Sequence, residues 1–301
     1  MSRKPNLLFI FTDQQRYDTM ACYGNQWIET PNLNGLADES FVFQRAYVTQ
    51  PICTPARSSI MTGLYPHTNG CIELNVPLKP ETQTIAEMVS DQYRCGYYGK
   101  WHLGDEIVAQ HGFTEWVSIE DYYRRYYSRP EYLSLYSSYH NYLVDCGYAP
   151  DIERVGGAVF DRVTSARLPE EHTKARYTGR EAARFIREAG DQPFVLYVGM
   201  FEPHNPYVGP LDDLYAPDEM PVGPQFRRRS GEYSSMLHRT LAEHYMNGGA
   251  MYGEDLSTEA GCRRIRAQYM GNVTLIDRAV GDILFSLQES GQAENTIVVF
   301  T

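Results

Sequence analysis

Three short, nearly continuous apolar segments place the strongest constraint on the fold of this 301-residue chain. They cover residues 6–12 (NLLFIFT), 193–200 (PFVLYVGM) and 296–301 (TIVVFT). A strand that is buried on both faces reads as a continuous apolar run, whereas a half-buried strand alternates apolar and polar residues. The three segments therefore predict buried, central strands of a parallel sheet.

Amphipathic helical patterns lie between these strands. Thr84 with Glu87 and Thr178 with Glu181 each form a capping-box pattern, so we expect a helix to begin after each threonine. Residues 265–287 carry apolar side chains at helical spacing and predict a longer helix. Strands that alternate with helices predict an α/β fold with a mainly parallel central sheet flanked by helices.

Two stretches interrupt the alternation: residues 118–150, which are crowded with tyrosine, and residues 205–260, which are rich in proline, glycine and charge. We predict one catalytic domain over residues 1–301, with both stretches as insertions that shape a substrate entrance. The tyrosines suit either stacking on sugar rings or packing on the core, and we favour packing. Because a strand pattern ends at Thr301, we expect the domain to lack its C-terminal part.

Composition narrows the possible partners. The formal net charge of −11 argues against nucleic acid, because binding to a phosphate backbone needs a basic face. A basic pocket in an acidic protein can still attract a small anion. No segment reaches the roughly 18 apolar residues of a membrane span, and no signal-peptide pattern is present. We therefore expect no membrane partner and a cytoplasmic location, or a periplasmic or secreted one if a leader was removed.

Cys53 stands out among six scattered cysteines, none of which forms a CxxC pair. Pro55 suits a first helical turn and Gly63 suits a C-terminal stop, so Cys53 should lie at a helix N-terminus, where negative charge is favoured. Arg57 follows one turn later and can reach the same anion. Asp13 directly follows the first predicted strand, where a carboxylate suits a hard divalent cation. A structural cysteine and a turn aspartate are the plainer alternatives.

Taken together, several segments resemble the sulfatase family. The run 53–57 (CTPAR), followed by SSIMTG, is similar to the first sulfatase signature, and residues 96–104 (GYYGKWHLG) match the second. Residues 5–16 resemble the first strand and metal corner of the family. Residues 203–206 (PHNP) resemble its later histidine motif, and residues 269–281 its long helix. The match runs in order along nearly the whole chain.

The resemblance implies hydrolysis of a sulfate ester, of a carbohydrate or an aryl group. It implies that a separate maturation enzyme oxidises Cys53 to formylglycine, whose hydrate attacks sulfur with the help of a divalent metal, expected to be Ca²⁺. Asp13, Gln14 and the modified Cys53 would bind that metal. Gln14 stands where many relatives carry a second aspartate, so the metal site would have one negative charge fewer. Further ligands are expected beyond residue 301, so this chain alone should bind metal weakly and turn over poorly.

The remaining site residues are also assigned by the resemblance. Arg57 would orient and stabilise the hydrate, and Lys100, His102 and His204 would contact the sulfate or the leaving oxygen, with His204 a candidate general acid. Lys100 and His102 are two residues apart, so on an extended segment they should point to the same face. His204 follows the second apolar run, again at the carboxyl end of a strand.

Two other functions remain open. A phosphonate monoester or phosphodiester hydrolase of the wider alkaline phosphatase superfamily uses a similar C-x-P-x-R site, although Lys100 and His102 favour the sulfate-cleaving members. A non-catalytic binding relative would not need the maturation motif, so the intact Cys53 and Arg57 argue against one. Carbohydrate sulfates are the favoured substrates, because the insertions are large and rich in aromatic residues.

Overall fold

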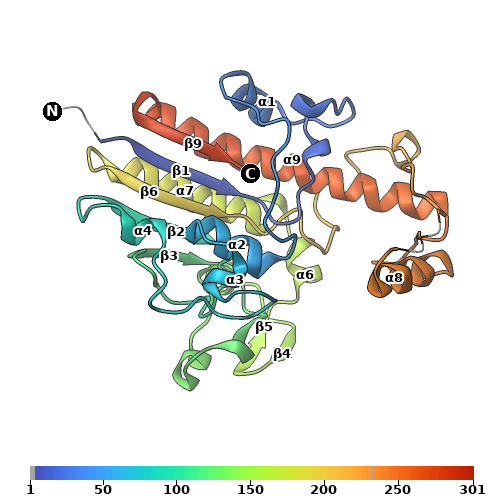
Figure 1. Cartoon of the computed structure of the whole chain (residues 1–301), viewed down its shortest axis with the longest axis horizontal. Helices are drawn as coiled ribbons and strands as arrows, with labels where there is room; N and C mark the ends of the chain where they lie inside the picture. Colours follow the sequence, from blue (N-terminus) through green and yellow to red (C-terminus); the bar gives the residue numbers. More distant parts are fainter. Residues whose placement is uncertain (1–3, 229, 232) are drawn as a thin grey trace.

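The computed structural model describes residues 4–228, 230–231 and 233–301. At its centre lies a five-stranded, all-parallel sheet with the strand order β3-β2-β6-β1-β9 (Figure 1). This arrangement confirms the predicted α/β class and parallel sheet. The strands are β1 (Asn6–Phe11), β2 (Arg94–Gly99), β3 (Glu115–Ser118), β6 (Phe194–Gly199) and β9 (Thr296–Phe300).

Helices cover both faces of the sheet. Two long helices, α7 (Lys174–Ala189) and α9 (Glu259–Glu289), pack side by side behind it in Figure 1. Alternation along the strands divides the core, so that Leu8 faces α7 and α9 whereas Leu7 packs on the opposite side. Three short helices lie on that opposite side: α2 (Cys53–Thr62), α3 (Pro66–Asn69) and α4 (Ile85–Met88).

All three predicted strands form, but the third is not a central strand of the sheet. The first two apolar runs form β1 and β6, and every residue of β6 is buried. The prediction of a central, buried strand is wrong for the third run, because β9 lies at the sheet edge, pairs with β1 and leaves Ile297 56% exposed. The strands β2 and β3 were not predicted. Glycines and Arg94 interrupt the apolar run of β2, and β3 is only four residues long.

Two of the three helix predictions are confirmed, and one capping box is wrong. The capping box of Thr84 and Glu87 is confirmed at α4, although this helix has a single turn. The capping box at Thr178 is wrong, because α7 begins at Lys174, where the Thr173 side chain accepts a hydrogen bond from the Arg176 amide. Thr178 is buried inside the helix. The helical pattern of residues 265–287 is confirmed within α9.

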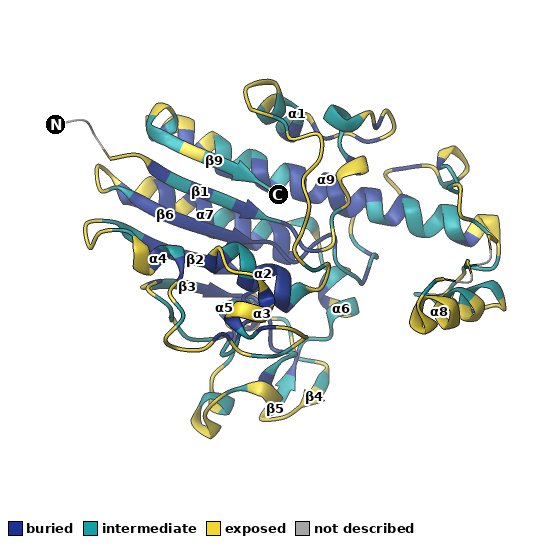
Figure 2. Ribbon diagram, viewed as in Figure 1, coloured by how far each residue is buried: buried dark blue, intermediate teal, exposed yellow. Residues whose placement is uncertain are grey.

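The two predicted insertions lie in different places. Residues 118–150 cover the β3 side of the sheet, whereas α8, within residues 205–260, lies beyond one end of α9 and is largely exposed (Figures 1 and 2). Within the described part of the chain, no helix combines the length and apolarity needed to cross a membrane. The remaining helices and strands are α1 (Pro31–Asp38), α5 (Ser138–Asp145), α6 (Arg162–Ala166), α8 (Met236–Met246), β4 (Ile152–Arg154), β5 (Gly157–Val159), β7 (Ala250–Met251) and β8 (Glu254–Asp255).

The close approach of β2 and β6 at their carboxyl ends yields a prediction. Gly99 has a φ of +123°, and a Cβ added there would lie 2.0 Å from the carbonyl oxygen of Gly199. We expect Gly99→Ala to lower the free energy of unfolding in urea by about 2 kcal/mol or more, because both the backbone and the contact become strained. Gly35→Ala in α1 is the control, since its Cβ meets open space and alanine favours a helix by roughly 0.5–1 kcal/mol. Equal losses in the two variants would contradict the argument.

Candidate active site

Three neighbouring strands deliver the predicted site residues to one edge of the sheet. Asp13 lies two residues after β1, Lys100 directly follows β2, and His204 lies five residues after β6. Because the strands are parallel, their carboxyl ends meet at this edge. Cys53 is the first residue of α2, whose N-terminus points at the same place. Residues that are far apart in the sequence thus form one cluster.

The carboxylate of Asp13 is the centre of the cluster. It is buried, and its Oδ2 accepts hydrogen bonds from Lys100 Nζ at 2.6 Å and from Arg57 Nη2 at 3.2 Å. Its Oδ1 lies 3.5 Å from the Sγ atom of Cys53. Burial alone would raise the pKa of Asp13, but the ammonium and guanidinium groups outweigh it and hold this pKa well below its usual value. Asp13 is therefore a carboxylate at neutral pH.

Both cations are enclosed by protein. Lys100 is fully buried and Arg57 is 3% exposed. Burial would lower the pKa of Lys100, yet the Asp13 carboxylate raises it above its ordinary value, so the ammonium persists. Arg57 also donates hydrogen bonds to the Lys100 carbonyl and to the hydroxyl of Tyr97 at 3.3 Å. One carboxylate and two cations leave the centre with an excess positive charge that suits a bound anion.

The thiol of Cys53 is not prepared to act as an anion. Burial raises its pKa, and the nearby Lys100 ammonium, whose Nζ lies 3.9 Å from the sulfur, compensates only in part. A position at a helix N-terminus predicted negative charge here, and the structure places the thiol as predicted. However, the thiol is neutral at pH 7, and a neutral thiol is a weak nucleophile.

His102 is held from both sides. Its ring stacks on Tyr123 with the centroids 3.9 Å apart, and its Nε2 lies 2.9 Å from Oδ1 of Asn75. Burial and the Lys100 charge lower the pKa of His102 to about 2, so the imidazole is neutral. The predicted extended segment is wrong, because His102 has a left-handed φ of 57°. Its position in the site results from this turn and not from strand alternation.

The ring of His204 has an assignable tautomer. Its Nδ1 lies 2.7 Å from the carbonyl oxygen of Asn205, which can only accept, so Nδ1 carries the proton and Nε2 keeps its lone pair. Burial and the Lys100 charge lower the pKa of His204 to about 4. Ligand atoms of Asp13, Cys53 and His204 lie within 4.8 Å of one another, close enough to surround a metal ion. At neutral pH this histidine is a ligand or base more readily than an acid.

Gln14 differs from the rest of the predicted cluster. It has a left-handed φ of 66° and its side chain is exposed beside the buried Asp13. Its backbone carbonyl accepts a hydrogen bond from Tyr269 at 2.8 Å. This geometry fixes the turn after β1 and leaves the amide pointing away from the buried centre, toward solvent. Its role as a metal ligand stays a prediction.

Sequence reasoning missed the residues that support this centre. Glu106 is fully buried and accepts hydrogen bonds from the backbone amides of Trp101 and His102, which fixes the turn after β2. Burial raises the pKa of Glu106 to about 7. Asn75 and Tyr123 were missed as well. Glu106 lies four residues beyond His102 but in no recognised pattern, whereas Asn75 and Tyr123 come from distant segments that only the fold brings to His102.

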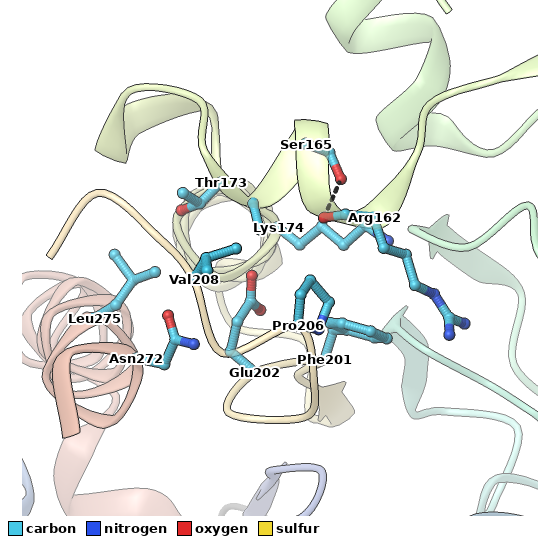
Figure 3. Close-up of a pocket in the computed structure, with 11 residues that line it drawn as sticks. Arg162, Ser165, Thr173, Lys174, Phe201, Glu202, Pro206, Val208, Asn272 and Leu275 are labelled. Carbon is cyan, nitrogen blue, oxygen red and sulfur yellow. Dashed lines mark hydrogen bonds between the residues drawn. The ribbon is translucent and has the colours of Figure 1, made fainter. Parts of the chain in front are cut away.

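A second layer of charge lies behind the centre. Glu120 is fully buried and forms ion pairs with both Arg162 and Lys174. Figure 3 shows Glu202 pointing into the neighbouring cavity of about 10 Å³, which has room for roughly one water molecule. Burial raises the pKa of Glu202 to about 7. These groups lie between the sheet edge and α6, so further paired charges back the centre.

Removing the Asp13 carboxylate tests how far the centre depends on it. We expect Asp13→Asn to lower the free energy of unfolding at pH 7 by about 3 kcal/mol or more, because Lys100 and Arg57 stay buried without their counter-ion. The difference from the wild type should shrink as the pH falls through and below the ordinary range of an aspartate, because the unfolded wild-type chain then takes up a proton at Asp13 while the folded chain keeps the carboxylate ionised. The exposed Asp38→Asn should change stability by less than about 0.5 kcal/mol. Equal urea midpoints for all three proteins would exclude this role.

The buried neutral His204 predicts a pH dependence of stability. Between pH 6.5 and 4 the unfolded chain binds a proton at this histidine while the folded chain does not, so stability falls as the pH falls. We expect His204→Gln to remove up to about 1.4 kcal/mol per pH unit of this slope. Urea titrations at several pH values measure it. Parallel curves for variant and wild type would refute the assignment.

Comparison with known proteins places this geometry in a known context. The family model described as Sulfatase matches residues 5–301. An uncharacterized sulfatase YidJ of Escherichia coli K12 is 26% identical over 308 residues, which cover 99% of this chain and 56% of the relative. An ulvan-active sulfatase of Formosa agariphila is 26% identical over 99% of this chain and 50% of its own length. This chain therefore spans about half the length of these curated relatives.

A solved structure supports the fold independently. The phosphonate monoester hydrolase SpPMH of Silicibacter pomeroyi superposes with a TM-score of 0.76. The superposition covers 99% of this chain and 62% of that one, at 22% sequence identity. At that identity the likeness establishes a shared architecture, and not a shared substrate.

Proposed function

The chain belongs to the sulfatase family, and from this premise we propose that it hydrolyses sulfate esters at the Asp13–Cys53 centre. The observation that carries the proposal is the position of the thiol. Its sulfur lies 3.5 Å from an ionised carboxylate oxygen and 3.9 Å from a buried ammonium nitrogen. A sulfate group brought to this thiol would meet cations on one side and potential metal ligands on the other.

A divalent cation fits the donor atoms of the centre. Asp13 is ionised, and ligand atoms of Asp13, Cys53 and His204 lie within 4.8 Å of one another. We assign Ca²⁺ to Asp13, to Gln14 on the exposed side and to the oxygen that replaces the sulfur of Cys53, because calcium prefers oxygen ligands. A bound cation would supply positive charge that activates an oxygen nucleophile and polarises the ester. His204, a nitrogen donor, is then left to face the sulfate.

Chemical conversion of Cys53 agrees with its surroundings. A thiol whose pKa is raised by burial is a poor nucleophile in its own right. We propose that a maturation enzyme oxidises it to formylglycine, whose hydrated aldehyde would supply the attacking oxygen. Arg57, which donates to Asp13 and to the Lys100 carbonyl, holds this end of α2 against the sheet edge.

The remaining residues bind and orient the ester. Lys100 keeps its proton and can donate to a sulfate oxygen, since its pKa lies above the ordinary value. His102 is neutral and is fixed by Asn75 and Tyr123, so it offers a preset contact with the sulfate or the leaving oxygen. The Nε2 lone pair of His204 can accept a hydrogen bond or a proton. Charge in the transition state is thus met by groups that need not reorganise.

Activity and mass measurements test the proposal together. With whole protein produced alongside a formylglycine-generating enzyme, we expect the Cys53 peptide to lose mass. We also expect 4-nitrophenyl sulfate to be hydrolysed faster than a phenyl phosphonate ester. Cys53→Ala should lower kcat by at least about a thousandfold, and chelation of divalent cations should lower it as well. Cys146→Ala, at an exposed cysteine, is the matched control and should retain the wild-type kcat.

Two results would overturn the assignment in different ways. Preference for the phosphonate ester would favour the phosphonate hydrolase alternative. An unconverted Cys53 together with absent turnover would favour a non-catalytic binding relative.

A further inference from the structure

A wide cleft opens beside the candidate active site, between residues 122–126 and the hairpin formed by β4 and β5. Its volume is about 550 Å³, which is within the range of small-ligand sites. Its wall includes Asn75 and Tyr123, the two residues that hold His102. Figure 1 shows the hairpin beyond the β3 edge of the sheet. A molecule in this cleft would therefore continue directly from the reacting group at the centre.

The floor of the cleft is preformed. Arg124 is 1% exposed, and it donates hydrogen bonds to the carbonyl of Val155 at 2.8 Å, to that of Leu135 at 2.7 Å and to that of Gly156 at 3.2 Å. These bonds tie the segment 122–126 to the β4–β5 hairpin. Because the donors of Arg124 are used within the protein, this arginine shapes the cleft and does not bind a ligand. A preformed site avoids the cost of ordering loops on binding.

Two other arginines on the cleft wall keep their charges available. Arg125 and Arg154 are exposed, and neither forms an ion pair with a carboxylate among the residues that the structure describes. The guanidinium carbon of Arg154 lies 4.3 Å from the centre of the Tyr122 ring, and that of Arg125 lies 4.7 Å from the Tyr126 ring. A guanidinium held over an aromatic face still offers N–H groups to an anion.

The charge of the cleft opposes that of the protein. Glu153 is the single carboxylate among the described residues that line it, against the arginines at 124, 125 and 154. The chain as a whole has a formal net charge of −11. A local excess of positive charge on an acidic protein, combined with tyrosine rings, suits a ligand that has both sugar-like faces and anionic groups.

We propose that this cleft binds the part of the substrate beyond the scissile sulfate and selects saccharides that carry a second anionic group. Tyr126 offers a flat face to a sugar ring, since Tyr122 is already covered by Arg154 and Arg162. Arg125 and Arg154 bind the second anionic group, a carboxylate or a sulfate, by paired hydrogen bonds. The inference rests on the proposed function, which places the scissile sulfate at Cys53 and hence the adjoining ring next to His102.

Calorimetric titration of the unconverted Cys53 protein, which lacks the formylglycine nucleophile, tests the cleft directly. The probes are three O-sulfated disaccharides whose second ring is a hexuronate, a sulfated hexose or a neutral hexose. We expect both dianionic probes to bind about tenfold or more tightly than the neutral one. Arg125→Gln combined with Arg154→Gln should remove that preference, and tighter binding of only one dianionic probe would support the cleft and identify the anion it selects. Arg187→Gln, at an exposed arginine on α7, alters charge away from the cleft and should keep the preference.

The outcomes separate this inference from the proposed function. Equal affinity for the dianionic probes and the monoanionic probe with a neutral second ring, or a preference that survives in the double variant, overturns the cleft assignment even if 4-nitrophenyl sulfate is hydrolysed. A preference lost only in the double variant supports it, even if the matured protein fails to hydrolyse any sulfate ester. Loss of the preference in Arg187→Gln as well would show a general charge effect and would overturn it.

Discussion

One buried carboxylate between two buried cations holds this site together. Asp13 lies after β1, Lys100 after β2 and Arg57 on α2, so a single set of charges joins three separate segments. Isolated, either cation would be costly to bury, and the carboxylate offsets that cost while keeping both cations charged. The position of the thiol follows in part, because Arg57 ties α2 to Asp13 and Thr54 donates a hydrogen bond to the carbonyl of His102.

The parallel sheet supplies the frame for this interaction. The central strands β2, β6 and β1 end at the same edge, and the carbonyl of Gly199 accepts the amide of Lys100 at 2.8 Å, just where the chain leaves the sheet. Behind this edge, Glu106 fixes the turn that carries His102, and Glu120 pairs with two further cations. The centre is thus prearranged by backbone as much as by side chains, so the proposed sulfate ester would meet charges and dipoles that are already in place.

Local sequence signals predicted the parts of this molecule that depend on local structure. The apolar runs of β1 and β6 and the turn chemistry around Cys53 act through neighbouring residues, so the sequence displays them. Thr178 shows the limit, because a capping pattern inside α7 is overruled by a better cap five residues earlier. Asn75 and Tyr123 contact His102 from distant segments of the chain, and residue spacing in the sequence does not predict such contacts. The edge position of β9 depends on which strands pair, which a single run cannot encode.

The charges of this protein affect an approaching anion mainly at short range. The net charge of −11 opposes the approach of an anion, yet opposition between exposed charges fades over about 8 Å at physiological salt. Inside the site, Lys100 and Arg57 are shielded from that salt by burial, and the cleft arginines act only on a ligand already in contact with the tyrosine rings. In the proposed function, an anion would therefore be selected at contact and not steered from a distance. Such a surface would combine weak long-range repulsion with a strong, local preference for an anion of the right shape.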